Sequence, residues 1–497
     1  MNRLHLSARY QRGQALIFGI FVLVAGLAAL FFFFNVGQLS REKTKLVNTA
    51  DAVAYSAGVV HARALNFNAY ANRALIANEV LIAQMVSLSS WSSYVTSWAE
   101  ALPIVHNECV QAAYGNYWAV AASQVKYGPD YLVGCAALYL ASEYGVIEQM
   151  NGILEDAIPA VIQNAEVNKG ILQGAQTALN LGLVADRSRV MNAVAEANYA
   201  GDGDVEVDGW GAPSTLPDDW VRMPTGTGGV SPFVQRYADD DRTRFKEATI
   251  TAANTDPFIR QRSWTSTSAL PEPSCLPFNW RQNEVRRRGG TELLSFEEWQ
   301  AVDTQSWHSN YRGKRPWNCN RRETSTGEGG QQAYNADQDP GSASFGRSST
   351  DNPQAHSGAV SRSTGSGLGY SGLPDSFDLN KAWINGARST ETPRLLHGVR
   401  LTRNQSQLRT TDGTTGQIQT QSSSRIGAYR SAVAGGVIAA ASAAEVFFER
   451  PATQSDNVFG APLGRPRELG SLFNPYWQVR LVSTNAMGEW VRQGVSP

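Results

Sequence analysis

Charge is scarce in this sequence and nearly balanced. Only 18% of the 497 residues are charged, and 43 Lys and Arg face 44 Asp and Glu, for a net charge of -1. A chain this close to neutrality has no overall field that would attract nucleic acid or an anionic surface. We therefore predict no nucleic-acid partner and expect charged recognition to be local. The 42% apolar content excludes a chain that is disordered throughout.

The common sequence motifs of catalysis and cofactor binding are also missing. The chain has no His-Glu-x-x-His, no Walker A and no Gly-x-Ser-x-Gly pattern, and its six histidines are scattered singly. A Gly-x-Gly-x-x-Gly match at residues 367–372 lies in a Gly- and Ser-rich stretch, without the strand and helix that a dinucleotide site needs. We predict no enzymatic activity, no cofactor and no metal site.

Cysteine is rare, and no Cys-x-x-Cys pair occurs. The four cysteines are Cys109, Cys135, Cys275 and Cys319. An oxidising compartment would permit two disulfides, and four cysteines allow three pairings. We favour Cys109 with Cys135 and Cys275 with Cys319, which places one bond in each region of the chain. The first pair requires a break in the helices near Gly115.

One long hydrophobic run stands near the N-terminus. Residues 15–34 read ALIFGIFVLVAGLAALFFFF, without a charge or a proline, and as a helix they span about 30 Å, the thickness of a bilayer core. A cleaved signal would be shorter and would end in a small-x-small site. We therefore predict a retained transmembrane helix over residues 14–35. Residues 1–13 carry three arginines and no acid, which favours a cytoplasmic tail, although residues 41–45 are also basic.

Apolar residues continue beyond this run in a heptad pattern. From Leu46 to Leu88 a four-three alternation is apolar at every position except Asn78, which predicts a long helix over residues 36–101. One row of the stripe holds small residues, Ala50, Ala57, Ala64 and Ala71. The stripe fits the buried face of a helix in a bundle or, alternatively, a surface for self-association in which Asn78 fixes the register.

The N-terminal region resembles a known family module. Arg12-Gly13, the apolar run, Asn35-Val36-Gly37-Gln38-Leu39 and the segment KLVNTADAVA at residues 45–54 are similar in order and spacing to TadG-like proteins of the Flp, or tight-adherence, pilus-assembly system. The resemblance is specific over about residues 11–60. It implies a bacterial envelope protein anchored by one helix that acts with pilus or secretion-system proteins. Pilin-like members carry Glu five residues after the cleaved glycine, where this chain has Phe18.

The remainder divides by composition. Residues 102–200 are rich in Ala, Leu, Ile and Val at helical spacing, which predicts a helical region. Short Val-, Thr- and Trp-bearing runs between Gly and Pro predict a mixed α/β region over residues 201–322. Ser, Gly and Thr dominate residues 323–371, which we expect to form a flexible surface excursion. Residues 372–497 are expected to form a C-terminal α/β region with an Ala-rich helix at 427–450. The predicted fold class is α+β.

Arginine and tryptophan gather between the third and fourth cysteines. The candidate interaction residues are Trp280, Arg286, Arg287, Arg288, Trp299, Trp307, Arg312 and Trp317. Together they offer hydrogen-bond donors and flat apolar faces to a glycan, an anionic polymer or another protein. The alternative interpretation is that Arg stacks on Trp to fill a small core.

These observations predict a membrane-anchored structural component of a Tad/Flp-type pilus-assembly or secretion system. It would cross the bacterial inner membrane once, with its ectodomain periplasmic or extracellular. The alternatives are a surface adhesin or glycan-binding envelope protein that uses the Trp/Arg segment, and an anchored cell-wall enzyme. For the enzyme, the sequence offers only separated acids such as Asp239, Asp240 and Asp241.

Overall fold

The computed structural model describes residues 14–208, 216–276, 280–314, 318–335, 346–363, 368–404, 407–408, 437–450 and 470–485. The chain forms two compact units, and each is built from separate stretches of sequence. Unit 1 contains residues 1–67, 179–235 and 379–497, and unit 2 contains residues 68–178 and 236–378. This division differs from the contiguous domains expected from composition, because two long helices each contribute to both units. The predicted α+β class is confirmed.

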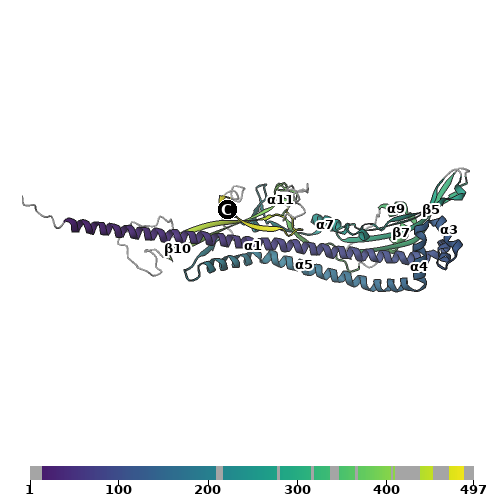
Figure 1. Ribbon diagram of the computed structural model, residues 1–497, viewed down its shortest axis with the longest axis horizontal. Helices are drawn as coiled ribbons and strands as arrows, with labels where there is room; N and C mark the ends of the chain where they lie inside the picture. The colour runs from purple at the N-terminus through teal and green to yellow at the C-terminus, as the bar shows by residue number, and fades with distance from the viewer. Residues whose placement is uncertain are drawn as a thin grey trace, which may run out of the picture. The chain divides into compact units, whose positions relative to one another are not determined.

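The predicted membrane helix and the predicted heptad helix are one continuous element. Helix α1 runs from Gln14 to Val105, 92 residues without a break (Figure 1). The second long helix, α5, covers Val146–Asn198. Many apolar residues between Leu46 and Leu102 are buried, whereas those from Leu16 to Phe33 are exposed. The same helix therefore serves two environments in succession.

Unit 1 is built on a four-stranded antiparallel sheet. Its strand order is β1-β10-β11-β12, with bounds Glu206–Asp208, Arg394–Asn404, Val437–Phe448 and Trp477–Val482. One core cluster joins α1, the C-terminal part of α5 and this sheet, through residues such as Leu46, Ala57, Met191, Val399 and Ala444. Figure 1 shows β10 following α1 in this unit. The sheet and α5 thus bury α1 immediately after its exposed apolar segment.

Strand β11 corrects the expected Ala-rich helix at residues 427–450. Residues 437–448 form a central strand paired with β10 and β12, and residues 427–436 lie outside the described part of the chain. Ala443 and Ala444 are fully buried, so the small side chains that favour a helix locally let the sheet approach α1 closely instead. Tertiary packing overrides the local preference here.

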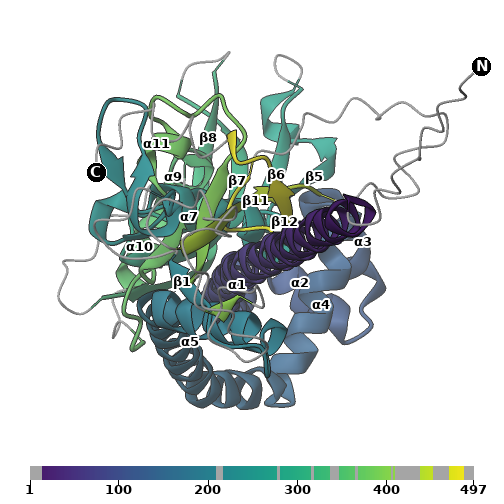
Figure 2. The same ribbon diagram turned by 90° about the vertical axis from the view of Figure 1, so that its left-hand side faces the viewer.

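Unit 2 carries the short helices that follow α1. They are α2 (Asn107–Ala113), α3 (Tyr117–Tyr127) and α4 (Pro129–Glu143), and Figure 2 shows them gathered together. Gly115 and Gly128 have φ values of +81° and +96° at the turns between them, a region that glycine enters readily. The break at Gly115 brings Cys109 within 6.0 Å of Cys135 (Cα to Cα), and the two are disulfide-bonded.

A second antiparallel sheet, of order β5-β6-β7-β8, completes unit 2. Its strands cover Trp264–Pro271, Gln282–Leu293, Glu298–Arg312 and Cys319–Tyr334. A disulfide joins Cys275 to Cys319, the first residue of β8. Both disulfides therefore join the partners that the sequence favoured.

Strand β8 also corrects the expected flexible excursion at residues 323–371. Instead of leaving the protein, residues up to Tyr334 form a long strand, and α9 (Gly346–Asp351) and α10 (Pro353–Arg362) follow; residues 336–345 and 364–367 lie outside the described part. Glycine serves close packing: a Cβ on Gly329 would lie 2.1 Å from the carbonyl oxygen of Ser90. The Gly-rich composition lets the strand lie against α1.

The remaining elements are short. The helices are α6 (Asp219–Arg222), α7 (Thr243–Ala253), α8 (Pro257–Arg260) and α11 (Lys381–Ile384). Strands β2 (Met223–Pro224) and β3 (Val230–Ser231) pair with each other, as do β4 (Val234–Tyr237) and β9 (Ser376–Leu379).

Candidate membrane-proximal site

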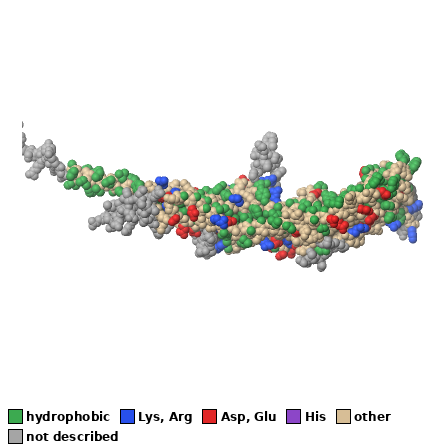
Figure 3. Space-filling model, turned by 90° about the horizontal axis from the view of Figure 1, so that it is seen from below, with side chains coloured by type: hydrophobic (Ala, Val, Ile, Leu, Met, Phe, Trp, Pro, Cys, Tyr) green, Lys and Arg blue, Asp and Glu red, His purple; other side chains and the backbone are tan. Residues whose placement is uncertain are grey.

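The first part of α1 is an exposed apolar helix. Its most apolar 18-residue window has a mean hydropathy of 2.8, and none of that window is buried in the protein. Figure 3 shows apolar side chains gathered on this projecting end. Phe18 and Phe33 are 72% and 69% exposed, which would be unfavourable in water. By length and composition this segment is a candidate membrane span, and the next turns of α1 form the site described below.

Two ion pairs, one buried and one half-buried, hold α1 just beyond this segment. Arg403 of β10 donates from Nη1 to Glu42 Oε2 at 2.6 Å, and Lys45 Nζ lies 2.6 Å from Asp202 Oδ2. Arg403 also donates to the carbonyl oxygens of Asp202 and Gln407. The side chains of Arg403 and Glu42 are 0% and 5% exposed, so each charge depends on its partner. We call Glu42, Lys45, Tyr199, Asp202 and Arg403 the collar.

An aromatic ring completes the collar. The Lys45 ammonium lies 4.2 Å from the centroid of the Tyr199 ring, and the Arg403 guanidinium carbon lies 4.8 Å from it. Cations over an aromatic face are attracted by its quadrupole. Burial raises the pKa of the Tyr199 phenol, and Arg403 opposes this shift. The phenol therefore remains neutral near pH 7, and both cations lie close to its ring.

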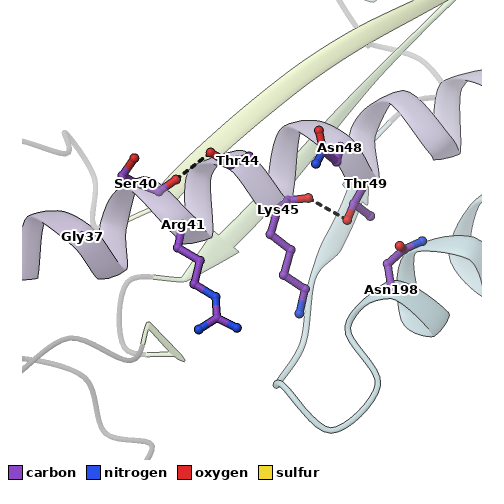
Figure 4. A pocket seen from close by; sticks show the side chains of 8 residues that line it. All are labelled: Gly37, Ser40, Arg41, Thr44, Lys45, Asn48, Thr49 and Asn198. Atoms are coloured by element: carbon purple, nitrogen blue, oxygen red, sulfur yellow. Dashed lines mark hydrogen bonds between the residues drawn. The ribbon is translucent and has the colours of Figure 1, made fainter.

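An open hollow of about 630 Å³ lies beside the collar. Apart from Gly37, its lining residues have polar or charged side chains, none of them a carboxylate: Gly37, Ser40, Arg41, Thr44, Lys45, Asn48, Thr49 and Asn198. Figure 4 shows Arg41 and Lys45 extending from the same side of α1, with Asn198 opposite them on α5. The Thr44 and Thr49 hydroxyls donate to the carbonyl oxygens of Ser40 and Lys45, each at 2.9 Å. The hollow therefore presents two cations, hydroxyl groups and amides.

The small-residue row of α1 is buried within the chain itself. Ala50 and Ala57 pack in the unit 1 core against the sheet and α5, and Ala64 and Ala71 are 2% and 3% exposed. Asn78 donates from Nδ2 to the carbonyl oxygen of Ala74 in the same helix, at 2.8 Å. The interpretation as a surface for a second copy is thus wrong for this row, because the chain's own core covers it.

The buried face of α1 drifts away from the heptad positions. After Ala71 the fully buried side chains include Leu75, Glu79 and Ile82, each one residue beyond a heptad position. A straight α-helix has 3.6 residues per turn and rotates by about 20° per heptad against a 3.5-residue repeat. The strict stripe therefore leaves the core within a few turns, and polar residues such as Ser87 and Ser90 enter it.

The Trp/Arg residues do not share one exposed surface. Trp299 is 1% exposed and donates to Glu79, whereas Trp280 is 73% exposed and Arg312 is exposed. Arg287 lies over the Tyr94 ring at 4.0 Å. The remaining members are Arg286, paired with Glu284, Arg288, paired with Asp351, half-buried Trp307, and Trp317, which lies outside the described residues. Most of these Trp and Arg side chains are buried in unit 2 or lie at the edge of its interior.

Two other polar clusters are buried, one in each unit. In unit 2, Glu79 accepts from Trp299 and Tyr370 and lies 2.6 Å from Lys169 Nζ. Burial raises the pKa of Glu79, and Lys169 is the largest opposing influence. Lys169 also pairs with Glu166 at 2.7 Å. These contacts connect α1, α5 and β7 inside the unit.

The unit 1 cluster surrounds Arg187. This guanidinium binds both carboxylate oxygens of Asp218, at 2.7 and 2.6 Å, and contacts His61 Nε2 at 3.0 Å. The His61 ring stacks on Trp220, with His397 edge-on to it. Burial is the main cause that lowers the pKa of His61 well below 6.5 and the pKa of His397 to about 3. Both rings are therefore neutral at pH 7.

Among the described residues, no group of three or more His, Cys, Asp and Glu could hold a metal ion. The acids Asp239, Asp240 and Asp241 form a single 3-10 turn. The membrane-proximal arrangement can bind and position anionic groups, and the collar can fix α1 to the folded unit.

These features first define a class: an α+β protein whose N-terminal candidate membrane helix continues into the core of a folded unit. Residues 13–64 match the family model described as "Putative Flp pilus-assembly TadE/G-like". The match confirms the resemblance of the N-terminal module and indicates a role related to the Tad/Flp pilus. The matched residues cover the apolar segment, the hollow's α1 residues and most of the α1 portion in unit 1. Searches of curated proteins and of solved structures find no match.

The sequence did not reveal the collar residues that pair with α1, namely Asp202 and Arg403. Glu42, Lys45 and Thr49 share one face of α1 at helical spacing, which is a detectable local pattern. Arg403 lies 361 residues from Glu42, and no periodicity connects them. Only the folded chain brings the two together.

Proposed function

We propose that this protein is a membrane-anchored structural component of a Tad/Flp-type pilus-assembly or secretion system. It crosses the inner membrane once and acts through protein-protein contacts of a periplasmic ectodomain. One observation carries this proposal: the Tad-like segment forms both the exposed apolar helix and part of the buried unit 1 core. The membrane helix is thus an integral part of the ectodomain rather than a detachable tether.

The collar supports a mechanical role for this continuity. Because Arg403 and Glu42 are buried and paired, breaking their contact leaves an uncompensated charge at a cost of about 3–5 kcal/mol. Unit 1 is therefore held firmly to the helix that enters the membrane. A tilt of the membrane helix is therefore transmitted to unit 1, and a force on unit 1 to the membrane helix, because no flexible segment separates them.

Two further observations support the periplasmic side. The chain carries two disulfides, Cys109–Cys135 and Cys275–Cys319, and such bonds persist in oxidising compartments. The basic residues 1–13 precede the span, and basic flanks favour the cytoplasmic side. Burial in the protein interior is the largest cause of the pKa shifts of Glu79 and His61, which favours a structural role over a catalytic one.

The test compares three forms of the protein in a strain that lacks its gene. One is the full chain, one is residues 35–497 exported behind a cleavable signal, and one is a chimera with an unrelated apolar helix of equal length in place of residues 15–34. All three keep the collar. We expect the full chain and the chimera to restore pili, and the soluble form to fail. Protease added to spheroplasts should digest the ectodomain of the full chain.

Full restoration of pili by the soluble form would overturn the proposal, because anchoring would then be dispensable. A full chain that resists protease in intact spheroplasts and is digested only after lysis would overturn the periplasmic assignment alone.

A further inference from the structure

We propose that the hollow beside α1 binds the headgroup of an anionic phospholipid, with the phosphodiester against Arg41 and Lys45. The inference rests on the proposed insertion of residues 15–34 in a membrane. It adds a ligand site that would fix the depth and rotation of α1 in the bilayer.

The hollow begins at the level of the lipid headgroups. With a rise of 1.5 Å per residue, Gly37 lies about 5 Å and Arg41 about 10 Å beyond Phe34, the last residue of the apolar run. The headgroup layer on each side of a bilayer is roughly 5–8 Å thick. Gly37 therefore lies within the headgroup layer and Arg41 a few ångströms beyond it, whereas Lys45 and Asn48 lie about 17 and 21 Å beyond Phe34. Side chains of a helix lean toward its N-terminus, so Arg41 and Lys45 extend toward the headgroups.

The lining has the chemistry of a phosphodiester site. Arg41 is exposed, and a guanidinium binds two phosphate oxygens at once. Lys45 binds Asp202 and keeps further N–H donors, because an ammonium has three. Within the described residues no hydrogen bond is assigned to the hydroxyl of Ser40 or to the amide of Asn48. The hydroxyl of exposed Thr44 already donates to the Ser40 carbonyl oxygen and can accept from a headgroup hydroxyl, whereas Thr49 is buried.

The position beside the apolar helix favours a lipid over a soluble anion. Phe33, Phe34 and Val36 are 69%, 52% and 40% exposed and lie on the turns that precede the hollow. Acyl chains attached to a headgroup in the hollow can lie along these side chains, which gives apolar contact that a free phosphate cannot make. A hollow of about 630 Å³ is within the range of small-molecule sites.

Lys43 provides a matched control for the charge of Arg41. It is also exposed and basic, and it lies two residues away on the same helix, but it does not line the hollow. A diffuse attraction of basic residues to anionic lipid would treat the two cations alike. If the lipid binds in the hollow, loss of the Arg41 charge weakens binding more than loss of the Lys43 charge.

The experiment titrates lipid into the full chain in a neutral detergent and counts bound lipids by native mass spectrometry. The probes are phosphatidylglycerol and phosphatidylcholine with identical acyl chains. We expect tighter binding of phosphatidylglycerol, and a loss of about fivefold in its affinity in Arg41→Gln, the size expected for one basic contact. Lys43→Gln should stay within about twofold of the unchanged chain. Thermal unfolding should be equal for all forms.

Three results would overturn the inference. They are equal affinity for the two lipids, equal losses in Arg41→Gln and Lys43→Gln, and displacement of phosphatidylglycerol by millimolar inorganic phosphate, which would indicate a soluble anion. Failure of the proposed membrane anchoring gives a different result from failure of the headgroup site. If the chain is not inserted, alkaline carbonate releases it from cell membranes. If the chain is inserted but shows no lipid preference, only the headgroup site is contradicted.

Discussion

At Gly58, α1 packs closely against the unit 1 sheet, and the replacement of this residue by alanine tests that packing. A Cβ at this position would lie 2.4 Å from Val479 Cγ2 of β12 and 3.1 Å from Ala444 Cβ of β11. Real Cβ atoms do not approach carbon this closely. Ala444 is fully buried and its Cβ moves only with the strand, so the sheet must shift even if Val479 rotates.

Two effects of opposite sign determine how much Gly58→Ala changes the stability of unit 1. Alanine in a helix interior is favoured over glycine by about 1 kcal/mol, whereas an added methyl group in a packed core costs about 1–3 kcal/mol. Gly182 of α5 is the matched control, because its nearest neighbour is Asp186 Oδ2 at 4.0 Å and it also lies in unit 1. Gly182→Ala should therefore show the helix gain alone. We expect Gly58→Ala to be less stable than Gly182→Ala by about 1–3 kcal/mol.

The assay is hydrogen–deuterium exchange of the full chain in detergent, read on peptides from β11 (Val437–Phe448). Exchange measures the free energy of opening in that part of the structure, so unit 2 does not contribute. The double variant Gly58→Ala/Val479→Ala should recover part of the loss, because it removes the atom nearest to the new methyl group. Equal or greater stability of Gly58→Ala relative to Gly182→Ala would refute the close packing of α1 on the sheet.

Two further predictions concern the buried polar clusters. Lys169→Met should lower the opening free energy of α5 near this residue by about 3–5 kcal/mol, because Glu79 then lies buried without its counter-ion; adding Glu79→Gln should restore part of it, and a loss below about 1 kcal/mol would contradict the buried pair. His397 is held neutral beside Arg187 and Asp218 with a pKa of about 3, while the unfolded chain takes up a proton near pH 6.5. Its stabilisation is therefore present above pH 6.5 and falls by about 2–3 kcal/mol at pH 4.5. Urea unfolding should show a flatter pH dependence in His397→Gln, and parallel curves would count against this.

Local patterns predicted the elements that depend on local interactions. The apolar run and the heptad stripe indicated a membrane-length helix continuing into a long helix, because both follow from side chains a few residues apart. The break near Gly115 could be inferred because the favoured Cys109–Cys135 pair requires the helices to turn there. The resemblance of the N-terminal module was also readable, since its residues lie close together in the sequence.

Strand β11 and strand β8 show where local reasoning fails. Alanine favours a helix in isolation, but in residues 437–448 its small side chain admits α1 against a central strand. Glycine suggested mobility in residues 323–371, but Gly329 is required because Ser90 of α1 occupies the space of a side chain. In both segments the sequence correctly indicated small side chains. Their structural role depends on α1, which is distant in the sequence.

A membrane-length apolar helix joined to a long amphipathic one, and a Tad-like N-terminal module, follow from the order of the amino acids alone. Which face of that helix is buried depends on the folded chain, because the 3.6-residue turn rotates a 3.5-residue stripe out of the core. The folded chain alone places Arg403 on Glu42, 361 residues apart in the sequence. A buried ion pair carries no local signature, since each charge is unfavourable until folding supplies the other.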